Sequence, residues 1–393
     1  MARAKDLPEG SAGGDWGEAQ RVRRSIASLV DQKAAANRLL TYALAAVVGL
    51  IALANIPRLQ SSYPSGIDVE IPLRAAAHWA SGAAVYPASA MQVQGGPELP
   101  YLYPPFLLPF LAQVTSFPHG TVINVWFCIC ILAATWTFRR LAIPWLAVPC
   151  LLAWPPTGEA LVVGNIQILL FAAFVAVFYE PRAGVLRQRP LRRDRDLLNG
   201  VLAGFTVAIK VGNFPALIFL ARRRFRAAFL AAAVFILIVL ATLPLTGTAI
   251  YFDWLAQLQR ASDPNWAPGG ITLSHHIGVP DAVTVAIGIA AALLLRGPDS
   301  VAWLGIALIL ATPNAHGHTF LFMLPALLII RRDIAIMIGA LFLSFWTAPM
   351  WAAWGLAAVV LAASNRWPEL RVSRLQDPIA SGPRAGAGAE ASA

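Results

Sequence analysis

Long apolar blocks alternate with short polar loops along most of this chain. The blocks are rich in Leu, Ala, Ile, Val and Phe, and they are longer than a soluble core requires. The pattern predicts apolar helices at 39–56, 104–117, 120–138, 141–156, 160–178, 198–220 (interrupted), 227–246, 281–295, 300–312, 319–330, 334–348 and 351–363. Several are shorter than the roughly 20 residues that cross a bilayer upright, which indicates tilted or re-entrant segments. We therefore expect an all-α, polytopic integral membrane protein with about 10–12 membrane segments.

The composition agrees with this expectation. Hydrophobic residues make up 58% of the 393 residues, and charged residues only 13%. A formal net charge of +10 would favour a nucleic-acid partner in a soluble protein, but here the arginines gather in short runs between apolar blocks, as they do in cytoplasmic loops. Cys128, Cys130 and Cys150 lie in apolar stretches without zinc or redox spacing, so we interpret them as packing residues. We expect no nucleic-acid partner.

The arginine runs also predict the orientation of the chain. The loops 182–195 and 222–226 are basic and should both face the cytoplasm, although only the segment 198–220 separates them. That segment should therefore enter the membrane and return, with its tip at 210–215, where Gly, Asn and Pro interrupt the helix. Arg139 and Arg140 are interpreted as an exception on the outer side.

The same alternation divides the chain into three parts. Residues 1–38 have mixed charge and no signal-type apolar region, so they should form a cytoplasmic segment, either a helix on lipid headgroups or a soluble helix. Residues 39–363 should form the membrane domain. It includes a first outer loop at 57–103 with short interfacial helices, and a second large outer loop at 247–280. Residues 364–393 should be a cytoplasmic, mostly disordered tail.

An acidic pair in the first outer loop, Asp68 and Glu70, is the leading candidate for chemistry. A partly shielded carboxylate at the membrane edge can have a raised pKa and accept a proton from an attacking hydroxyl. Alternatively, Asp68 caps a helix that begins near Val69, and Glu70 is favoured by the dipole of its first turn. Two carboxylates could also bind a divalent metal, but they are a weak signal alone.

Histidines gather in the other outer segments. His275 and His276 lie in the second outer loop, and Asn314, His316 and His318 lie between two apolar blocks. One or two of these imidazoles could contact a phosphate leaving group. The alternatives are a solvated loop and a four-nitrogen metal site; we do not favour a metal, and we expect no cofactor.

Polar residues inside the apolar blocks are a third group. Lys210 at the interrupted segment is costly in the membrane unless it pairs, so it either holds an anionic lipid phosphate or snorkels to the interface. Asn165 and Gln167 either line a sugar site or form hydrogen bonds between helices, and Glu159 is similar. Tyr103, at the end of the first outer loop, suits the headgroup level and is included among the candidate donor-binding residues.

These elements, in this order, resemble glycosyltransferase family 87, a mannosyltransferase-like family of the GT-C superfamily. The resemblance covers roughly residues 39–363. It is carried by the following elements: Asp68, Arg74–Ala76, Ser81–Tyr86, Tyr101–Pro105, Gly164–Gln167, Asn199–Gly204, Ala208–Lys210 and Thr312–His318. The chain departs from the family pattern at Thr312–Ala315, at the His-Gly-His element, and in the distance between Lys210 and Pro215.

The resemblance implies a GT-C type helical bundle in the cell membrane, with its active site on the periplasmic or extracytoplasmic side. It implies transfer of a sugar, mannose in this family, from a polyprenyl-phosphate donor to a glycolipid or glycan hydroxyl with inversion. Asp68 would be the general base, and His316 or His318 would contact the donor phosphate. The alternative from another class is a polytopic transporter or lipid-linked sugar flippase, which would predict internal repeats and charged residues at mid-membrane.

Overall fold

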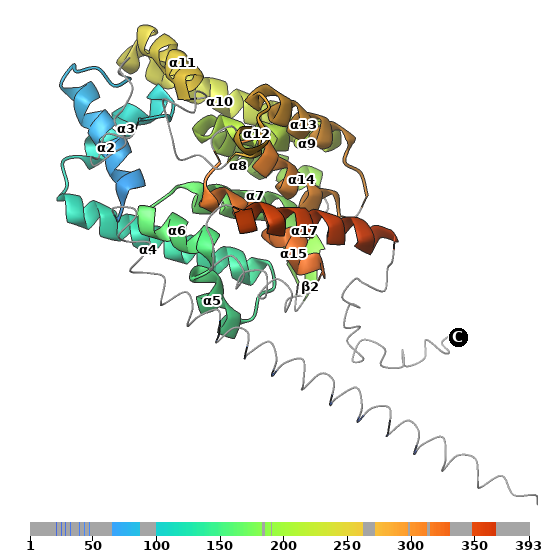
Figure 1. Ribbon diagram of the computed structural model, residues 1–393. Coiled ribbons are helices and arrows are strands. Elements are labelled where there is room, and N and C mark those ends of the chain that lie inside the picture. The colour runs from blue at the N-terminus through green and yellow to red at the C-terminus, as the bar shows by residue number, and fades with distance from the viewer. Residues whose placement is uncertain are drawn as a thin grey trace, which may run out of the picture.

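A computed structural model describes residues 65–86, 100–182, 185–189, 191–261, 272–297, 299–312, 315–330 and 348–366, and isolated helical positions at 21, 25, 28, 32, 39, 43 and 47. This part of the chain is almost entirely helical (Figure 1). Several predicted features lie outside the described residues: the N-terminal segment and the first span apart from those isolated positions, the span 334–347, Asn314, and the tail after 366.

The elements of the first half are short apart from one long helix: α2 (Ile67–Ala80), η1 (Pro105–Leu107), α3 (Leu108–Val114), α4 (His119–Arg140), η2 (Trp145–Ala147), α5 (Val148–Leu152), α6 (Pro155–Val163), α7 (Gln167–Phe178), β1 (Tyr179–Arg182) and β2 (Val185–Gln188). The second half contains another long helix: η3 (Arg193–Arg195), α8 (Asp196–Ile209), η4 (Val211–Asn213), α9 (Phe214–Arg223), α10 (Phe225–Thr246), α11 (Ala249–Ala261), α12 (Leu273–Ile277), α13 (Asp281–Leu294), α14 (Ser300–Leu310), η5 (Gly317–Met323), α15 (Leu324–Ile330) and α17 (Ala348–Arg366).

The region 141–178 does not form the two spans predicted for it. Instead of one helix at 141–156, it has η2, the short α5, and the beginning of α6. A proline precedes or begins each piece, because proline lacks an N–H for the preceding turn. The predicted helix at 160–178 is broken at Gly164, which has a left-handed φ of 74° and separates α6 from α7.

The all-α prediction needs one small correction. Strands β1 and β2 form an antiparallel hairpin directly after α7, with Tyr179 paired to Gln188. The hairpin begins the predicted cytoplasmic loop 182–195. It closes a loop and contributes no membrane segment.

The interrupted segment at 198–220 forms a helical hairpin, which confirms the predicted interruption near Lys210. Helix α8 ends at Ile209, η4 makes the turn, and α9 follows from Phe214. Asp196 at the start of α8 accepts a two-point hydrogen bond from Arg224 at the end of α9, with oxygen to nitrogen distances of 2.5 and 3.0 Å. Because this pair joins both ends of the hairpin, α8 and α9 run in opposite directions.

Small residues hold the α8–α9 hairpin against α10. A Cβ on Gly200 would lie 2.7 Å from Leu230 Cβ, and a Cβ on Gly204 would lie 2.5 Å from the carbonyl oxygen of Ala231. Only glycine permits backbones to approach this closely, which is typical of helix packing in membranes. Helices α8 and α10 therefore run side by side in the same direction (Figure 1).

One end of the molecule is rich in arginine. Arg140 and Arg189 both donate to the carbonyl of Ala176 near the end of α7, and Arg223 donates to Ser300 at the start of α14. The Asp196–Arg224 pair lies near these contacts, because the neighbouring Arg195 acts electrostatically on both Arg140 and Arg189. We call the residues Arg140, Arg189, Arg195, Arg223 and Arg224 the arginine end. The interpretation of Arg139 and Arg140 as an exception on the other side is wrong, because Arg140 contacts the same carbonyl as Arg189.

Four helices lead from the arginine end to the same region of the interior. Helices α7, α8, α9 and α14 have 12, 14, 10 and 11 residues. At 1.5 Å per residue they are roughly 15–21 Å long. Their far ends carry Gln167, Lys210, Asn213 and Thr312. This places the polar residues together, roughly 15–21 Å from the arginines.

Two helices are long and apolar enough to cross a membrane among the described residues, α4 and α10. Each has 22 residues, which is roughly 33 Å. On α4 the exposed side chains Val125, Ile129, Leu132 and Trp136 recur at helical spacing and form one apolar face. Such a face is expected to contact lipid.

The first outer loop contains the expected short helix, α2, which packs beside α3 (Figure 1). Its buried residues include Val69, Leu73 and Ala76, whereas Ala77 and Ala80 are exposed. Helix α11 packs over this region, and the indole of Trp254 donates to the carbonyl of Leu102 at 3.0 Å. The described parts of the two predicted outer loops thus meet at Leu102 and Trp254.

We predict that Arg224→Ala lowers the thermal unfolding midpoint of the detergent-solubilised protein. The Asp196 side chain is 2% exposed, so removing its partner leaves a buried carboxylate unpaired and opens the ends of the α8–α9 hairpin. Arg222→Ala is the matched control, because Arg222 is exposed in the same basic run. Equal midpoints for the two variants would contradict a structural role for the pair.

Candidate active site

Asp68 is held near the start of α2 by close backbone packing. Gly66 precedes the helix with a φ of 77°, and its N–H donates to the carbonyl of Val162 at 2.9 Å. Gly164 lies directly against this turn, since a Cβ there would be 2.6 Å from Val69 Cγ2. The indole of Trp126 donates to the Gly164 carbonyl at 2.7 Å. Two left-handed glycines therefore bring α2 against the junction of α6 and α7.

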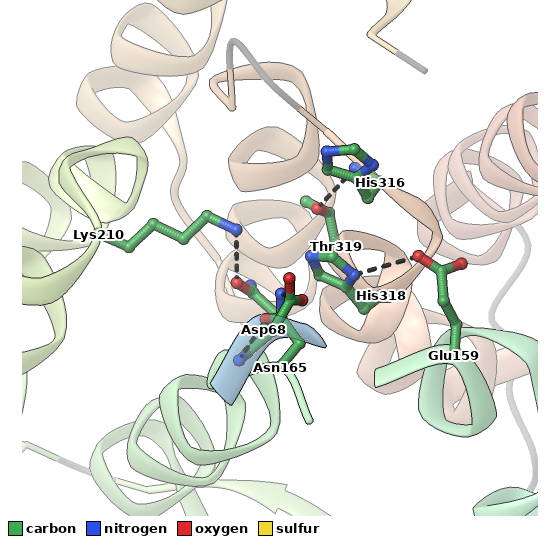
Figure 2. A network of polar contacts seen from close by, with 8 residues as sticks. Asp68, Glu159, Asn165, Lys210, His316, His318 and Thr319 are labelled. Carbon is green, nitrogen blue, oxygen red and sulfur yellow. Dashed lines mark hydrogen bonds and ion pairs between the residues drawn. The ribbon is translucent and has the colours of Figure 1, made fainter. Parts of the chain in front are cut away.

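The side chain of Asp68 does not cap its helix. No side chain caps α2, and Asp68 Oδ2 instead accepts a hydrogen bond of 2.6 Å from Asn165 Nδ2 (Figure 2). Burial raises the pKa of Asp68, while the nearby His318, the hydrogen bond from Asn165 and the charge of Lys210 lower it. The net effect is a raised pKa, which favours acceptance of a proton by this carboxyl.

Asn165 and Gln167 connect Asp68 to Lys210. Asn165 Oδ1 accepts the N–H of Gln167 at 2.8 Å, which orients the amide so that its Nδ2 faces Asp68. Gln167 Oε1 accepts a hydrogen bond of 2.8 Å from Lys210 Nζ. Of the alternatives for these amides, hydrogen bonding between elements is confirmed. Lys210 is paired at the tip of the hairpin and points toward the other polar residues (Figure 2).

The segment that follows α14 brings two histidines to the same place. The rings of His316 and His318 stack with their centroids 5.5 Å apart and their planes 19° apart. The backbone N–H of His316 donates to Thr319 Oγ1 at 3.2 Å. Burial lowers the pKa of His316 to about 4 and that of His318 to about 3. Both imidazoles are therefore neutral at pH 7, and Lys210 is left to supply positive charge at this site.

Glu159 on α6 is part of the same group, although the sequence suggested it only weakly. Its Oε1 lies 3.2 Å from His318 Nδ1, and the pair is buried (Figure 2). Burial raises the pKa of Glu159 to about 7, partly offset by His316 and by the backbone N–H groups of Gly317 and His318. The available signal was a lone acidic residue in an apolar block. We call Asp68, Glu159, Asn165, Gln167, Lys210, His316 and His318 the polar cluster.

Tyr103 lies at the edge of the polar cluster. Burial raises the pKa of its hydroxyl, and so does the nearby charge of Asp68. Its carbonyl accepts a hydrogen bond of 2.7 Å from the Tyr86 hydroxyl, and its ring contacts that of Tyr101 at 5.8 Å between centroids. The aromatic residues of the first outer loop thus form one packed group beside Asp68.

The remaining candidates are not brought into the polar cluster. Glu70 is not among the groups that act on Asp68, and His276 is exposed on α12. The His275 side chain and Asn314 lie outside the described residues. Within the described ranges, no group of three or more His, Cys, Asp or Glu side chains is arranged to hold a metal. Glu70, His275, His276 and Asn314 therefore stay predictions as secondary or acceptor residues.

Comparison with protein families identifies the chain. The sequence model of glycosyltransferase family 87 matches residues 101–315, which is more than half of the 393 residues. The chain belongs to glycosyltransferase family 87. Comparison with curated proteins finds no match, and comparison with solved structures finds none either. The matched range includes Tyr103, Asn165 and Lys210, whereas Asp68 lies well before its start and the two histidines lie just after its end.

Membership of family 87 confirms the resemblance seen in the sequence. The protein is a membrane-associated glycosyltransferase, and it has a sugar donor and an acceptor as substrates. The transporter and flippase alternative loses its support, because family 87 catalyses glycosyl transfer.

We predict that Gly164→Ala destabilises the glycosyltransferase by about 2 kcal/mol or more, because a left-handed φ and a tight Cβ contact add their costs. In a Val69→Ala background the loss should be smaller, since the Cγ2 that the new methyl meets is gone. Thermal or denaturant unfolding in detergent measures both effects. Gly120→Ala is the control, because Gly120 has open space around it; equal losses at 120 and 164 would contradict the packing argument.

Proposed function

We propose that the protein transfers a sugar from a polyprenyl-phosphate donor to a hydroxyl of a glycolipid or glycan acceptor, with Asp68 as general base. The observation that carries the proposal is the position of Asp68. Its carboxyl is bound by Asn165 and lies within the electrostatic influence of both His318 and Lys210. A base and a cation at one buried place are what this transfer needs.

In the proposed reaction the acceptor hydroxyl attacks the anomeric carbon while Asp68 takes its proton. The bond from the acceptor oxygen to the anomeric carbon forms, and the bond from that carbon to the donor phosphate oxygen breaks in the same displacement. The phosphate leaves with the electron pair and remains attached to its lipid. A single displacement inverts the anomeric configuration, and the carboxylate makes no covalent intermediate.

The departing phosphate requires positive charge and hydrogen-bond donors. Lys210 supplies the charge from the tip of the α8–α9 hairpin, and neutral His316 and His318 donate hydrogen bonds. Gln167 orients the ammonium group, and Tyr103 borders the sugar position. A sugar on a lipid phosphate already has a good leaving group, so no metal or other cofactor enters the proposal.

The depth of the polar cluster favours a lipid-bound donor. The cluster is roughly 15–21 Å from the arginine end, whereas a bilayer core is about 30 Å thick. If the arginine end faces the cytoplasm, as basic loops do, the cluster is recessed about 10 Å below the periplasmic or extracytoplasmic boundary. We therefore propose a GT-C type, multi-pass arrangement that opens to this side and to the surrounding lipid. Mannose is the proposed sugar, following the family resemblance.

The test of the function is transfer of radiolabelled sugar by membranes that contain the wild type or Asp68→Asn. A panel of polyprenyl-phosphate sugars serves as donors, and extracted membrane lipids serve as acceptors. We expect transfer from one donor by the wild type and at least a 100-fold loss in the variant, as is typical when a general base is removed.

Glu180→Gln is the control, because it neutralises a carboxylate of β1 that lies beside the arginine end and away from the polar cluster. Its activity should stay within a few fold of the wild type. Full activity of Asp68→Asn would remove Asp68 as the base. Transfer from sugar nucleotides alone would overturn the lipid-phosphate donor.

Lys210→Met should weaken inhibition by the product, polyprenyl phosphate. Loss of a charge-assisted hydrogen bond is worth about 1.5–3 kcal/mol, which corresponds to a roughly 10- to 150-fold higher inhibition constant. Lys210→Arg keeps the charge but changes its geometry, so its effect should be smaller. An unchanged inhibition constant in Lys210→Met would show that the phosphate binds elsewhere.

A further inference from the structure

Glu159 is a buried carboxyl that the proposed transfer does not use. Its side chain is 8% exposed, and it lies on α6 opposite the start of η5. Its Oε1 is 3.2 Å from His318 Nδ1, while the backbone N–H groups of Gly317 and His318 also act on the carboxyl. A buried ionisable group is costly unless it is paired, so its retention beside a site histidine suggests a role there.

The backbone around Glu159 is shaped to admit this carboxyl. A Cβ on Gly317 would overlap Glu159 Oε2, so any other residue at 317 would displace the carboxyl or the segment that carries the histidines. Gly317 separates His316 from His318 and allows both rings to stack on one side while the carboxyl approaches from the other. The approach of Glu159 to His318 thus depends on a glycine at this position.

The contact decides which ring nitrogen of His318 carries the proton. Nδ1 faces Glu159, and the second nitrogen lies on the side of Asp68 (Figure 2). When Glu159 is protonated it donates to Nδ1, and the imidazole proton stays on Nε2. When Glu159 is ionised it accepts from Nδ1–H, and Nε2 has only a lone pair to offer.

We propose that Glu159 is a positioning residue that sets the tautomer of His318, and that the protonated form of Glu159 keeps an N–H on Nε2 directed toward Asp68 and the reacting groups. This inference rests on the proposed function, because the donor on Nε2 matters only if Asp68 or a leaving phosphate accepts from it. Glu159 itself touches no substrate in this scheme.

The charges around the pair agree with this assignment. His316 and the two backbone N–H groups favour the ionised form of Glu159, but burial outweighs them and raises its pKa to about 7. Lys210 disfavours a positive charge on His318, whereas Asp68 favours one, and burial lowers the pKa of His318 to about 3. Below neutral pH the pair is therefore a neutral acid beside a neutral imidazole. As the pH rises through about 7, Glu159 ionises and Nε2 loses its proton.

The decisive experiment compares the pH dependence of sugar transfer by the wild type, Glu159→Gln and Glu159→Ala. Glutamine is neutral at every pH and can donate to Nδ1, so it imitates protonated Glu159. We expect Glu159→Gln to retain activity within about threefold at pH 6 and to lack the decline that the wild type shows above pH 7. Glu159→Ala should be impaired at every pH, because nothing then fixes the tautomer. A pH profile in Glu159→Gln with the same midpoints as the wild type would overturn the proposal.

A second measurement does not depend on activity. A carboxyl whose pKa is higher in the folded state than in the unfolded state stabilises the folded state. This contribution is complete at pH values below the unfolded-state pKa, and it is lost as the pH rises to the folded-state pKa. The thermal midpoint of the wild type should therefore fall relative to that of Glu159→Gln between about pH 4.5 and 7. If the thermal midpoints of the wild type and Glu159→Gln changed with pH in the same way, this would contradict the raised pKa of Glu159 and hence the change of tautomer. This result is separate from the proposed function, which fails if Asp68→Asn transfers sugar normally.

Discussion

Asp68 is half-buried, and nearby groups offset the cost of removing its carboxyl from water. Asn165 donates a hydrogen bond, Lys210 provides charge, and His318 is close enough to influence the carboxyl. Each comes from a different segment, so this arrangement forms only when α2, the α6–α7 junction, the α8–α9 hairpin and the segment after α14 have all packed. The architecture of the bundle is organised around this single requirement.

Much of the fold could be predicted from the sequence because apolar length and proline placement are local properties. The helix at 120–138, the helix at 227–246 and the break at Lys210 all follow from such patterns, and the structure confirms them. The prediction of two membrane helices at 141–178 was wrong because hydropathy measures how apolar a stretch is. It does not show where the backbone hydrogen bonds of a helix end. The prediction that Arg139 and Arg140 lie on the outer side was wrong for the same reason. It counted 141–178 as two membrane crossings, and the breaks in that region change this count.

The site was partly predictable for a different reason. Polar residues such as Asp68, Lys210 and His318 are conspicuous in an apolar chain, and the structure brings them together. Their partners were not predictable, because the pairing of Gln167 with Lys210 and of Glu159 with His318 joins residues 43 and 159 positions apart. The fit of Glu159 against Gly317 depends on backbone geometry that no pattern of residue types expresses.

The pairing of Asp196 with Arg224 has a mechanical consequence. The pair joins the start of α8 to the end of α9, and Lys210 lies at the opposite end of the hairpin, about 20 Å away. Because α8 is also packed along α10, the hairpin is fixed both at its base and along its length. The position of Lys210 therefore depends on a contact that lies about 20 Å from it, at the other end of the hairpin.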